Sequence, residues 1–405
     1  MRKIIISAIL SLSLITVTAQ VMTREDSLQA NLDARDANTY ISGYGELKYE
    51  YDFVDETGHA NLTRSVLFVG HRFNNKISFF SELELEDAKV EGGEPGGEIA
   101  LEQFYLRFNL SKDIYLVGGL FTPRLGIINE NHLPTTYNGN DRPIVERLVI
   151  PATWREIGIC VYGSLNSISG LNYTFGVVNG LNSEGFENGT GIRGGRFEGS
   201  NASASNLAVT GSLLYHFRDF RFQASGYYGG SAGLNKRDAD SLQLESGIFG
   251  TPVSITEANV QYNGKLISAR ALYAIGMIPD AGSINAAYAN NIPESFSGGY
   301  VEAGINLLYL FNKETKKNLT LFARYETMDL DQEIAENGIE NDINEKQYIV
   351  TGLTFKPIHG VAIKADYVLR TTGEQNPDLV LNPSPQAPPY STENGFFNLG
   401  FGFSF

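Results

Sequence analysis

The last twelve residues, Asn394–Phe405 (NGFFNLGFGFSF), decide the fold class. Their large apolar side chains stand at every second position: Phe397, Leu399, Phe401, Phe403 and Phe405. Because successive side chains of a β-strand point to opposite faces, this alternation predicts a strand with one apolar face and one small or polar face. In water such a strand exposes a flat aromatic edge that promotes aggregation, whereas in a membrane barrel it pairs with the first strand and faces lipid. A core strand of a soluble sheet is the alternative interpretation.

The same period of two residues recurs along the chain. In residues 39–53, apolar positions such as Leu47 and Tyr49 alternate with charged positions such as Glu46 and Lys48. We predict about sixteen strands, near 39–53, 61–73, 76–87, 99–110, 113–122, 155–164, 169–180, 206–217, 219–230, 251–263, 264–277, 297–311, 318–329, 345–357, 360–371 and 394–405. Each segment is about as long as a tilted strand that crosses a bilayer.

The connections between these segments alternate between short and long. The short ones are tight turns: Asn74-Asn75, Ser111-Lys112, Arg218-Asp219, Asn263-Gly264 and Pro357 to Gly360. The long ones are rich in Gly, Asn and acidic residues: 54–60, 88–98, 123–154, 181–205, 231–250, 278–296, 330–344 and 372–393. A membrane barrel has turns on its periplasmic side and long loops outside, and a soluble sandwich has no reason for this alternation. The predicted fold is therefore an all-β transmembrane antiparallel barrel with both termini on the periplasmic side.

The composition agrees with a barrel. Only 19% of the 405 residues are charged, while the mean hydropathy of -0.15 is too polar for a helical membrane protein. Arg2 and Lys3 followed by the apolar segment Ile4–Val17 are typical of a secretory signal. We predict three parts: a signal peptide at 1–19, a periplasmic lead-in at 20–38 and the barrel at 39–405. Cys160, the only cysteine, is expected to be a buried side chain rather than a reactive thiol.

The polar faces of the strands name the expected pore wall. The candidate pore-lining residues on strands are Glu46, Glu82, Glu84, Arg107, Arg221, Arg270, Arg324, Lys364 and Arg370. The acidic residues gather on the early strands and the arginines on the middle and late strands, and opposed charged walls would orient polar solutes. The alternative is that these charges pair with one another and only keep the lumen hydrated.

The long segment 123–154 adds three further candidates, Arg124, Arg142 and Arg147. A loop of this length without secondary structure of its own is usually functional. We expect it to fold into the lumen and narrow the channel as a constriction loop. The alternative is a surface loop packed on its neighbours.

Parts of this segment resemble a known family. Gly126-Ile-Ile-Asn-Glu-Asn-His-Leu-Pro, Asp141-Arg-Pro-Ile-Val-Glu and Ile150-Pro-Ala-Thr-Trp-Arg-Glu-Ile-Gly resemble the constriction-loop region of the phosphate-selective porin O and P family, as found in Bacteroidetes. Leu321-Phe-Ala-Arg-Tyr-Glu and Lys364-Ala-Asp-Tyr are similar to later strands of that family. The resemblance implies a sixteen-stranded homotrimer with a loop folded into the pore, and passive diffusion of small solutes, with lumen arginines that carry anions such as phosphate.

The expected function is therefore that of a porin in the outer membrane of a Gram-negative cell. Its expected partners are membrane lipid, small hydrophilic solutes, further copies of the chain and, since the last strand resembles an assembly signal, the outer-membrane assembly machinery. The acidic balance, -15 at pH 7, argues against nucleic acid as a partner. A non-conducting barrel that acts as an adhesin, receptor or structural protein is the alternative.

An enzyme is not expected. Gly229-Gly-Ser-Ala-Gly233 matches the nucleophile-elbow pattern, but no strand-to-helix turn is predicted there. The five histidines are His59, His71, His132, His216 and His359, and none is paired at a spacing typical of metal ligands. We therefore predict no catalytic residue, no cofactor and no metal.

Overall fold

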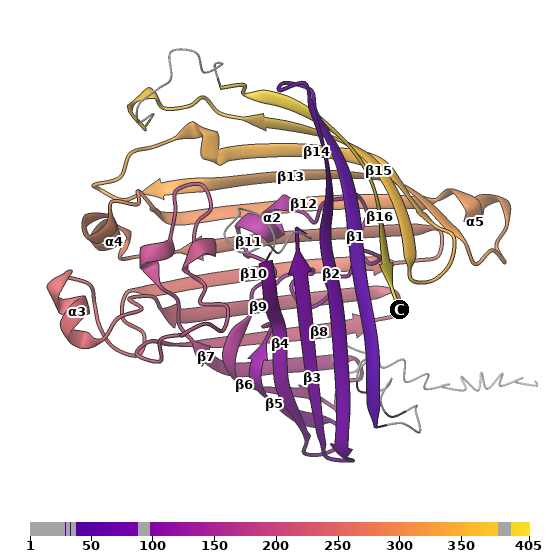
Figure 1. Ribbon diagram of the computed structural model, residues 1–405, viewed down its shortest axis with the longest axis horizontal. Coiled ribbons are helices and arrows are strands. Elements are labelled where there is room, and N and C mark those ends of the chain that lie inside the picture. Colours follow the sequence, from indigo (N-terminus) through magenta and orange to yellow (C-terminus); the bar gives the residue numbers. More distant parts are fainter. Residues whose placement is uncertain (1–28, 30–32, 34–37, 88–97, 380–389) are drawn as a thin grey trace, which may run out of the picture.

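The chain forms a closed barrel. The computed structural model describes residues 29, 33, 38–87, 98–379 and 390–405, and in these ranges sixteen antiparallel strands pair in chain order, with β1 closing on β16 (Figure 1). The strands are β1 (Thr39–Asp52), β2 (Thr57–Asn74), β3 (Ile77–Glu86), β4 (Glu98–Asn109), β5 (Ile114–Phe121), β6 (Glu156–Ser164), β7 (Leu171–Asn179), β8 (Leu207–Phe217), β9 (Phe220–Gly230), β10 (Pro252–Asn263), β11 (Ile267–Met277), β12 (Pro293–Asn306), β13 (Asn318–Ile334), β14 (Glu345–Lys356), β15 (Val361–Thr372) and β16 (Glu393–Ser404). This confirms the predicted fold class and all sixteen predicted strands.

Apolar side chains cover the outside of the barrel. Along β13, Leu321, Ala323 and Tyr325 are exposed, whereas the alternating residues Phe322, Arg324 and Glu326 are buried. The apolar residues of the last strand, Phe397, Leu399, Phe401 and Phe403, are 38–47% exposed. Such a surface is stable only in contact with lipid. The closed barrel and its apolar outer face confirm the predicted outer-membrane location.

The connections alternate in length with two exceptions. The helices α3 (Lys236–Ser241) and α4 (Ala281–Tyr288) lie at one end of the barrel, and α5 (Leu307–Phe311) and the C-terminus lie at the other (Figure 1). The predicted loop 54–60 is wrong, because β2 begins at Thr57 and leaves a tight turn. The predicted strand 297–311 ends early, at Asn306, where the chain turns into α5. No helix of the described ranges is long and apolar enough to cross a membrane.

Some predictions fall on residues for which no structure is described. The predicted signal peptide, 1–19, lies outside the described residues, and so does most of the lead-in at 20–38. The loops predicted at 88–98 and 372–393 are described only in part. Cys160 is buried, as predicted, and is 2% exposed.

The inner face of the barrel is less polar than predicted. Phe68, Phe80 and Tyr105 point inward from β2, β3 and β4, and the Phe80 ring centroid lies 5.9 Å from that of Phe68 and 5.4 Å from that of Tyr105. These rings belong to a buried apolar cluster that also contains residues of the long segment between β5 and β6. The period of two separates the faces of a strand, but a face that points inward meets water only where nothing else fills the lumen.

Candidate functional site

The segment 122–155, between β5 and β6, is folded into the lumen. It contains α2 (Ile144–Leu148) and forms hydrogen bonds to strands around the barrel. These bonds include His132 to Tyr44 (2.9 Å), Tyr137 to Glu46 (2.9 Å), Asn138 to Glu302 (3.0 Å), the Asn140 N–H to Asp366 (2.7 Å) and the Val145 N–H to Glu326 (3.0 Å). The partners come from β1, β12, β13 and β15. The predicted inward fold is confirmed, and we call residues 122–155 the inward segment.

The Glu146 carboxylate joins two parts of the inward segment to each other and to the barrel wall. One carboxylate oxygen accepts the N–H groups of Ile127 and Ile128 (2.8 and 2.6 Å), and the other accepts the hydroxyl of Tyr300 on β12 (2.6 Å). Burial raises the pKa of Glu146 to about 7, against the effect of these three donors. Gly126 makes the turn possible, because its φ is +70° and a Cβ there would lie 2.7 Å from the Glu146 carboxylate.

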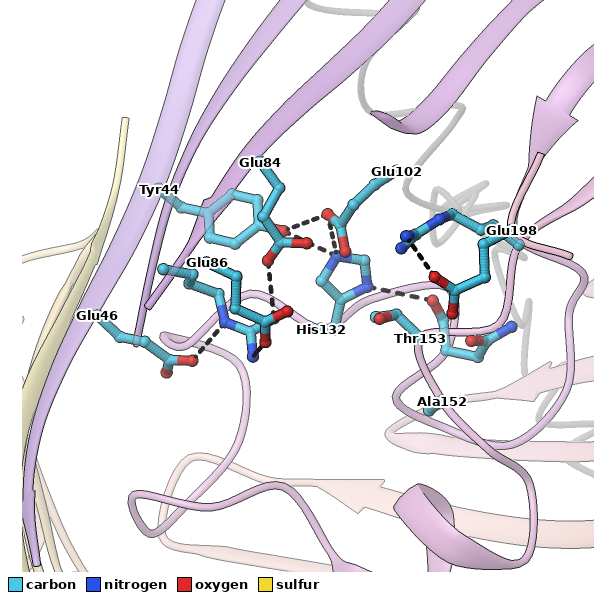
Figure 2. A network of polar contacts seen from close by, with 12 residues as sticks. Tyr44, Glu46, Glu84, Glu86, Glu102, His132, Ala152, Thr153 and Glu198 are labelled. Carbon is cyan, nitrogen blue, oxygen red and sulfur yellow. Dashed lines mark hydrogen bonds and ion pairs between the residues drawn. The ribbon is translucent and has the colours of Figure 1, made fainter. Parts of the chain in front are cut away.

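Between the inward segment and the early strands lies a cavity of about 380 Å³. On the strand side it is lined by Glu46 of β1 and by Glu84 and Glu86 of β3. On the other side are arginines of the inward segment and of the connection between β7 and β8: Arg142, Arg147, Arg155, Arg193 and Arg196. Figure 2 shows the wall carboxylates on one side and Ala152, Thr153 and Glu198 on the other. We call this space the lumen cavity.

Most acidic groups of the lumen cavity are already paired. Arg64 of β2 lies 2.7 Å from Glu46, 3.3 Å from Glu84 and 3.8 Å from Glu86, measured between nitrogen and oxygen atoms. Lys48 pairs with Asp141 at 2.6 Å. Glu198 pairs with Arg155 (2.8 Å) and Arg196 (2.6 Å). Each of these carboxylates therefore has a cation nearby, although Arg64 serves three of them.

Four cations of the lumen cavity have no such partner. Among the described residues, Arg142, Arg147, Arg193 and Lys364 form no ion pair with a carboxylate within 4.0 Å. The buried Nε and Nη2 atoms of Arg142 and the Nζ of Lys364 also have no hydrogen-bond partner in these ranges, although Lys364 lies 3.8 Å over the ring of Tyr137. Burial, followed by the charges of Arg196 and Arg147, lowers the pKa of Arg193 to about 10. Positive charge without a carboxylate partner thus remains in the lining of the cavity.

Of the twelve residues selected from the sequence, five line the lumen cavity: Glu46, Glu84, Arg142, Arg147 and Lys364. The others lie elsewhere in the barrel. Arg270 and Arg324 pair with Glu302 (3.0 and 3.1 Å), and Arg124 pairs with Glu130 (2.9 Å).

Three of the last four residues are engaged as well. Arg221 also approaches Glu130, at 3.8 Å, Arg107 lies 3.5 Å over the ring of Tyr115, and Glu82 accepts a hydrogen bond from Gln103 (2.7 Å). The buried Nε of Arg370 has no hydrogen-bond partner among the described residues, and the nearest rings are those of Phe396 (5.7 Å) and Tyr390 (5.9 Å). For most wall arginines, the alternative of mutual pairing describes the structure better than an open charged wall.

Sequence reasoning missed several cavity residues: Arg64, Arg155, Arg193, Arg196 and Glu198. Arg64 continues the inward alternation of β2 and could have been found by applying the period of two to that strand. Arg193 and Arg196 lie in the connection between β7 and β8. The sequence of this connection does not indicate whether it folds into the lumen. Ser231 of the nucleophile-elbow pattern is fully buried, and its hydroxyl donates to the carbonyl of Thr251 (2.7 Å).

Solved structures with the same fold are outer-membrane barrels. OmpT of Vibrio cholerae is 11% identical with a TM-score of 0.54, over 92% of this chain and 99% of that one. The outer-membrane channel DcaP of Acinetobacter baumannii is 12% identical with a TM-score of 0.56, over 91% and 97%. The anion-selective porin of Comamonas acidovorans is 11% identical with a TM-score of 0.54, over 91% and 99%. At this identity the likeness concerns the fold, which is that of outer-membrane porins.

A nearer relative is found by sequence. No family model matches the chain, so the resemblance to phosphate-selective porins stays a prediction. An uncharacterized protein of Aquifex aeolicus (strain VF5) is 32% identical over 332 residues, which are 81% of this chain and 74% of the relative. Identity at this level over this length indicates common ancestry. The chain belongs to the same family as this Aquifex aeolicus protein, whose name leaves its activity open.

Proposed function

We propose that this protein is an outer-membrane diffusion channel for small hydrophilic solutes, with a constriction that favours small anions. The observation that carries the proposal is the lumen cavity, in which positive side chains are left without carboxylate partners. A channel of this kind performs no chemistry on its solute, and it needs only a hydrated passage and a suitable field.

The charge balance of the lining supports the preference for anions. Eight basic and seven acidic residues line the lumen cavity, although the whole chain carries a net charge of -15. Five of the seven acidic residues lie within 4.0 Å of a cation, namely Glu46, Glu84, Glu86, Asp141 and Glu198, whereas Asp87 and Glu98 have no such partner among the described residues. Four unpaired cations therefore remain against two unpaired acidic residues, and this excess favours anions. Guanidinium groups suit oxyanions such as phosphate, which they bind through two parallel hydrogen bonds.

The test is a reversal-potential measurement on single channels in a planar bilayer with a KCl gradient. The wild type is expected to pass chloride in preference to potassium, and added phosphate is expected to lower the chloride current. Arg142→Gln combined with Lys364→Gln is expected to reduce the ratio of anion to cation permeability several-fold. Arg218→Gln, on the exposed turn between β8 and β9, is the matched control and should leave this ratio unchanged.

Two outcomes would reject the proposal. A wild-type channel that prefers potassium would reject the anion preference, and a folded protein that never opens a channel would reject diffusion altogether. If phosphate has no effect on the current, the solutes are limited to simple ions.

A non-conducting barrel is the second candidate, because the inward segment fills much of the lumen. Its residues Leu125, Ile128, Val145, Ile150 and Trp154 are at most 1% exposed and pack with the inner faces of the strands. Such a barrel would act through its outer loops as an adhesin, receptor or structural protein. It would give no conductance in the same bilayer experiment.

We also propose that the protein assembles as a homotrimer. One solved form of OmpT of Vibrio cholerae is described as a trimer. On the outside of β10–β13, an apolar hollow of about 580 Å³ is lined by small residues such as Ala258, Ala271 and Gly299. A hollow of this kind accommodates side chains of a neighbouring barrel. Native mass spectrometry in mild detergent is expected to show three chains, and a monomer would contradict the proposal.

A further inference from the structure

Three potential metal ligands from separate parts of the chain meet on the barrel wall. They are Glu82 of β3, Glu102 of β4 and His132 of the inward segment. One ligand atom of each lies within 4.8 Å of those of the other two, and all three side chains are fully buried. Glu102 and His132 are visible in Figure 2, beside the hydroxyl of Tyr44. None of the three lines the lumen cavity.

A β-bulge brings Glu102 into this cluster. In the pairing of β3 with β4, Glu82 is opposite Gln103 and Leu83 is opposite Leu101, so Glu102 is the extra residue. Both Glu102 and Gln103 are therefore buried on the inner side, although neighbours on a regular strand point to opposite faces. Bulges re-aim side chains and are frequent beside functional sites. The backbone of β4 is thus shaped to place a second carboxylate near Glu82.

One ring nitrogen of His132 is fixed by the backbone, and the other points toward the carboxylates. Its Nδ1 lies 3.2 Å from the carbonyl oxygen of Asn129. Because a carbonyl oxygen only accepts, Nδ1 carries the proton, so Nε2 offers a lone pair to a metal whenever the ring is neutral. This Nε2 lies 3.2 Å from Oε2 of Glu102 and 2.9 Å from the Tyr44 hydroxyl. Metal-bound histidines are oriented in the same way, by a carbonyl on the other ring nitrogen.

Glu102 brings a buried oxygen atom to the cluster. Its Oε2 accepts the Tyr44 hydroxyl at 2.8 Å. Oε1 of Glu102 is buried and has no hydrogen-bond partner among the residues that the structure describes. Two buried carboxylates at this distance repel each other unless a proton or a cation lies between them.

We propose that Glu82, Glu102 and His132 bind a divalent transition-metal ion of the Zn²⁺ class. Imidazole together with carboxylates suits zinc and its neighbours in the first row, whereas Ca²⁺ and Mg²⁺ prefer oxygen alone. Ligand atoms about 2.0–2.1 Å from a tetrahedral zinc are about 3.3 Å apart, close to the 3.2 Å between Nε2 of His132 and Oε2 of Glu102.

The ion would fasten the inward segment to the wall. His132 is the one ligand on the inward segment, and the two carboxylates belong to neighbouring strands, so the bound ion links the segment to β3 and β4. A protonated His132 paired with Glu102 is the competing account of the same geometry, since it also places a positive charge between the acceptors. The two accounts differ in whether metal binds, and neither depends on whether the channel conducts anions.

The test is metal binding by the full-length folded protein in detergent. The protein is treated with a chelator, dialysed and titrated with Zn²⁺ by calorimetry, and with Co²⁺ by visible absorption. We expect one ion per chain and a Co²⁺ spectrum of low coordination number. We also expect a thermal unfolding midpoint that rises by several degrees with Zn²⁺. Glu102→Gln and His132→Gln should weaken binding at least tenfold, while the matched control His59→Gln, at an exposed position, should bind like the wild type.

Folding of each variant is checked by circular dichroism. If one variant does not fold, the other variant and the Co²⁺ spectrum of the wild type still decide the question. Wild-type protein that binds neither ion at micromolar concentration would overturn the proposal in favour of the imidazolium pair. Equal affinity in the wild type and in a folded Glu102→Gln would also overturn it, because the ion would then lie elsewhere.

Discussion

Two groups of arginines lie inside the same barrel, and they differ in what faces them. In the wall group, on β11–β13, Arg270 and Arg324 enclose Glu302, and Arg324 also binds Glu326 at 2.8 Å. In the cavity group, Arg142 and Arg193 face the lumen cavity and have no carboxylate within ion-pair distance among the described residues. Both groups consist of the same kind of side chain inside the same barrel.

The difference shows that an inward arginine is not by itself a solute site. A buried guanidinium that is enclosed by carboxylates has its charge neutralised and its donors used, so it holds strands together. A guanidinium without these partners projects its field into the passage. The wall group is therefore expected to control the stability of the barrel, and the cavity group the choice of ion. The following changes test that division, in order of decreasing effect on stability.

Arg324→Ala should have the largest effect on stability. The change leaves Glu326 buried without its cation and removes one of the two cations that pair with Glu302. Breaking a buried ion pair in this way costs about 3–5 kcal/mol of folding free energy. Urea unfolding in detergent measures the change, with Arg218→Ala as an exposed control. A loss below about 1 kcal/mol, the range of exposed ion pairs, would remove the distinction between the two groups.

Gly126→Ala should have an intermediate effect, because the cavity group depends on the shape of the inward segment. A Cβ at φ +70° is strained and would also contact the Glu146 carboxylate. We expect a loss of about 1–2 kcal/mol by the same unfolding assay. Gly211→Ala on β8, where a Cβ would meet only ordinary contacts at 3.4 Å or more, is the matched control.

Acidification should have a smaller effect that is confined to the inward segment. Burial opposes ionisation of Asp141, but the charge and hydrogen bond of Lys48 outweigh it and lower the pKa of Asp141 below its ordinary value of 3.8. A lowered pKa adds stability above the ordinary value, and this stability is lost as the pH falls through the folded pKa. Thermal unfolding between pH 5 and pH 2 should therefore lose slightly more stability in the wild type than in Asp141→Asn. Parallel curves for the two proteins would exclude this contribution.

Arg142→Gln should have the smallest effect on stability, within about 0.5 kcal/mol, because its Nε and Nη2 lose no hydrogen bond to the described residues. The same variant should still shift the reversal potential. A large loss of stability would place Arg142 with the wall group and leave Lys364 as the main charge of the cavity.

Much of the fold was predictable because it rests on local rules. The inward positions of Glu84, Arg324 and Lys364 follow from the period of two, and burial confirms each of them. The position of Glu102 was not predictable, since a bulge in β4 interrupts that period and no residue marks it. The mixture of roles among the arginines was also hidden, because pairing depends on residues far apart in sequence, such as Arg64 and Glu46 on paired strands.

The sequence by itself determined the barrel, its sixteen strands, its apolar outer surface and the presence of a long segment between the fifth and sixth strands. Lipid contact demands an alternating pattern that a single strand can display, and hairpin turns keep neighbours in order. Only the tertiary structure decided which charges face the lumen cavity and which are neutralised. It also brought Glu82, Glu102 and His132 together from three segments. Electrostatics and metal coordination depend on distances of a few ångströms, and the path of the inward segment across the lumen sets those distances.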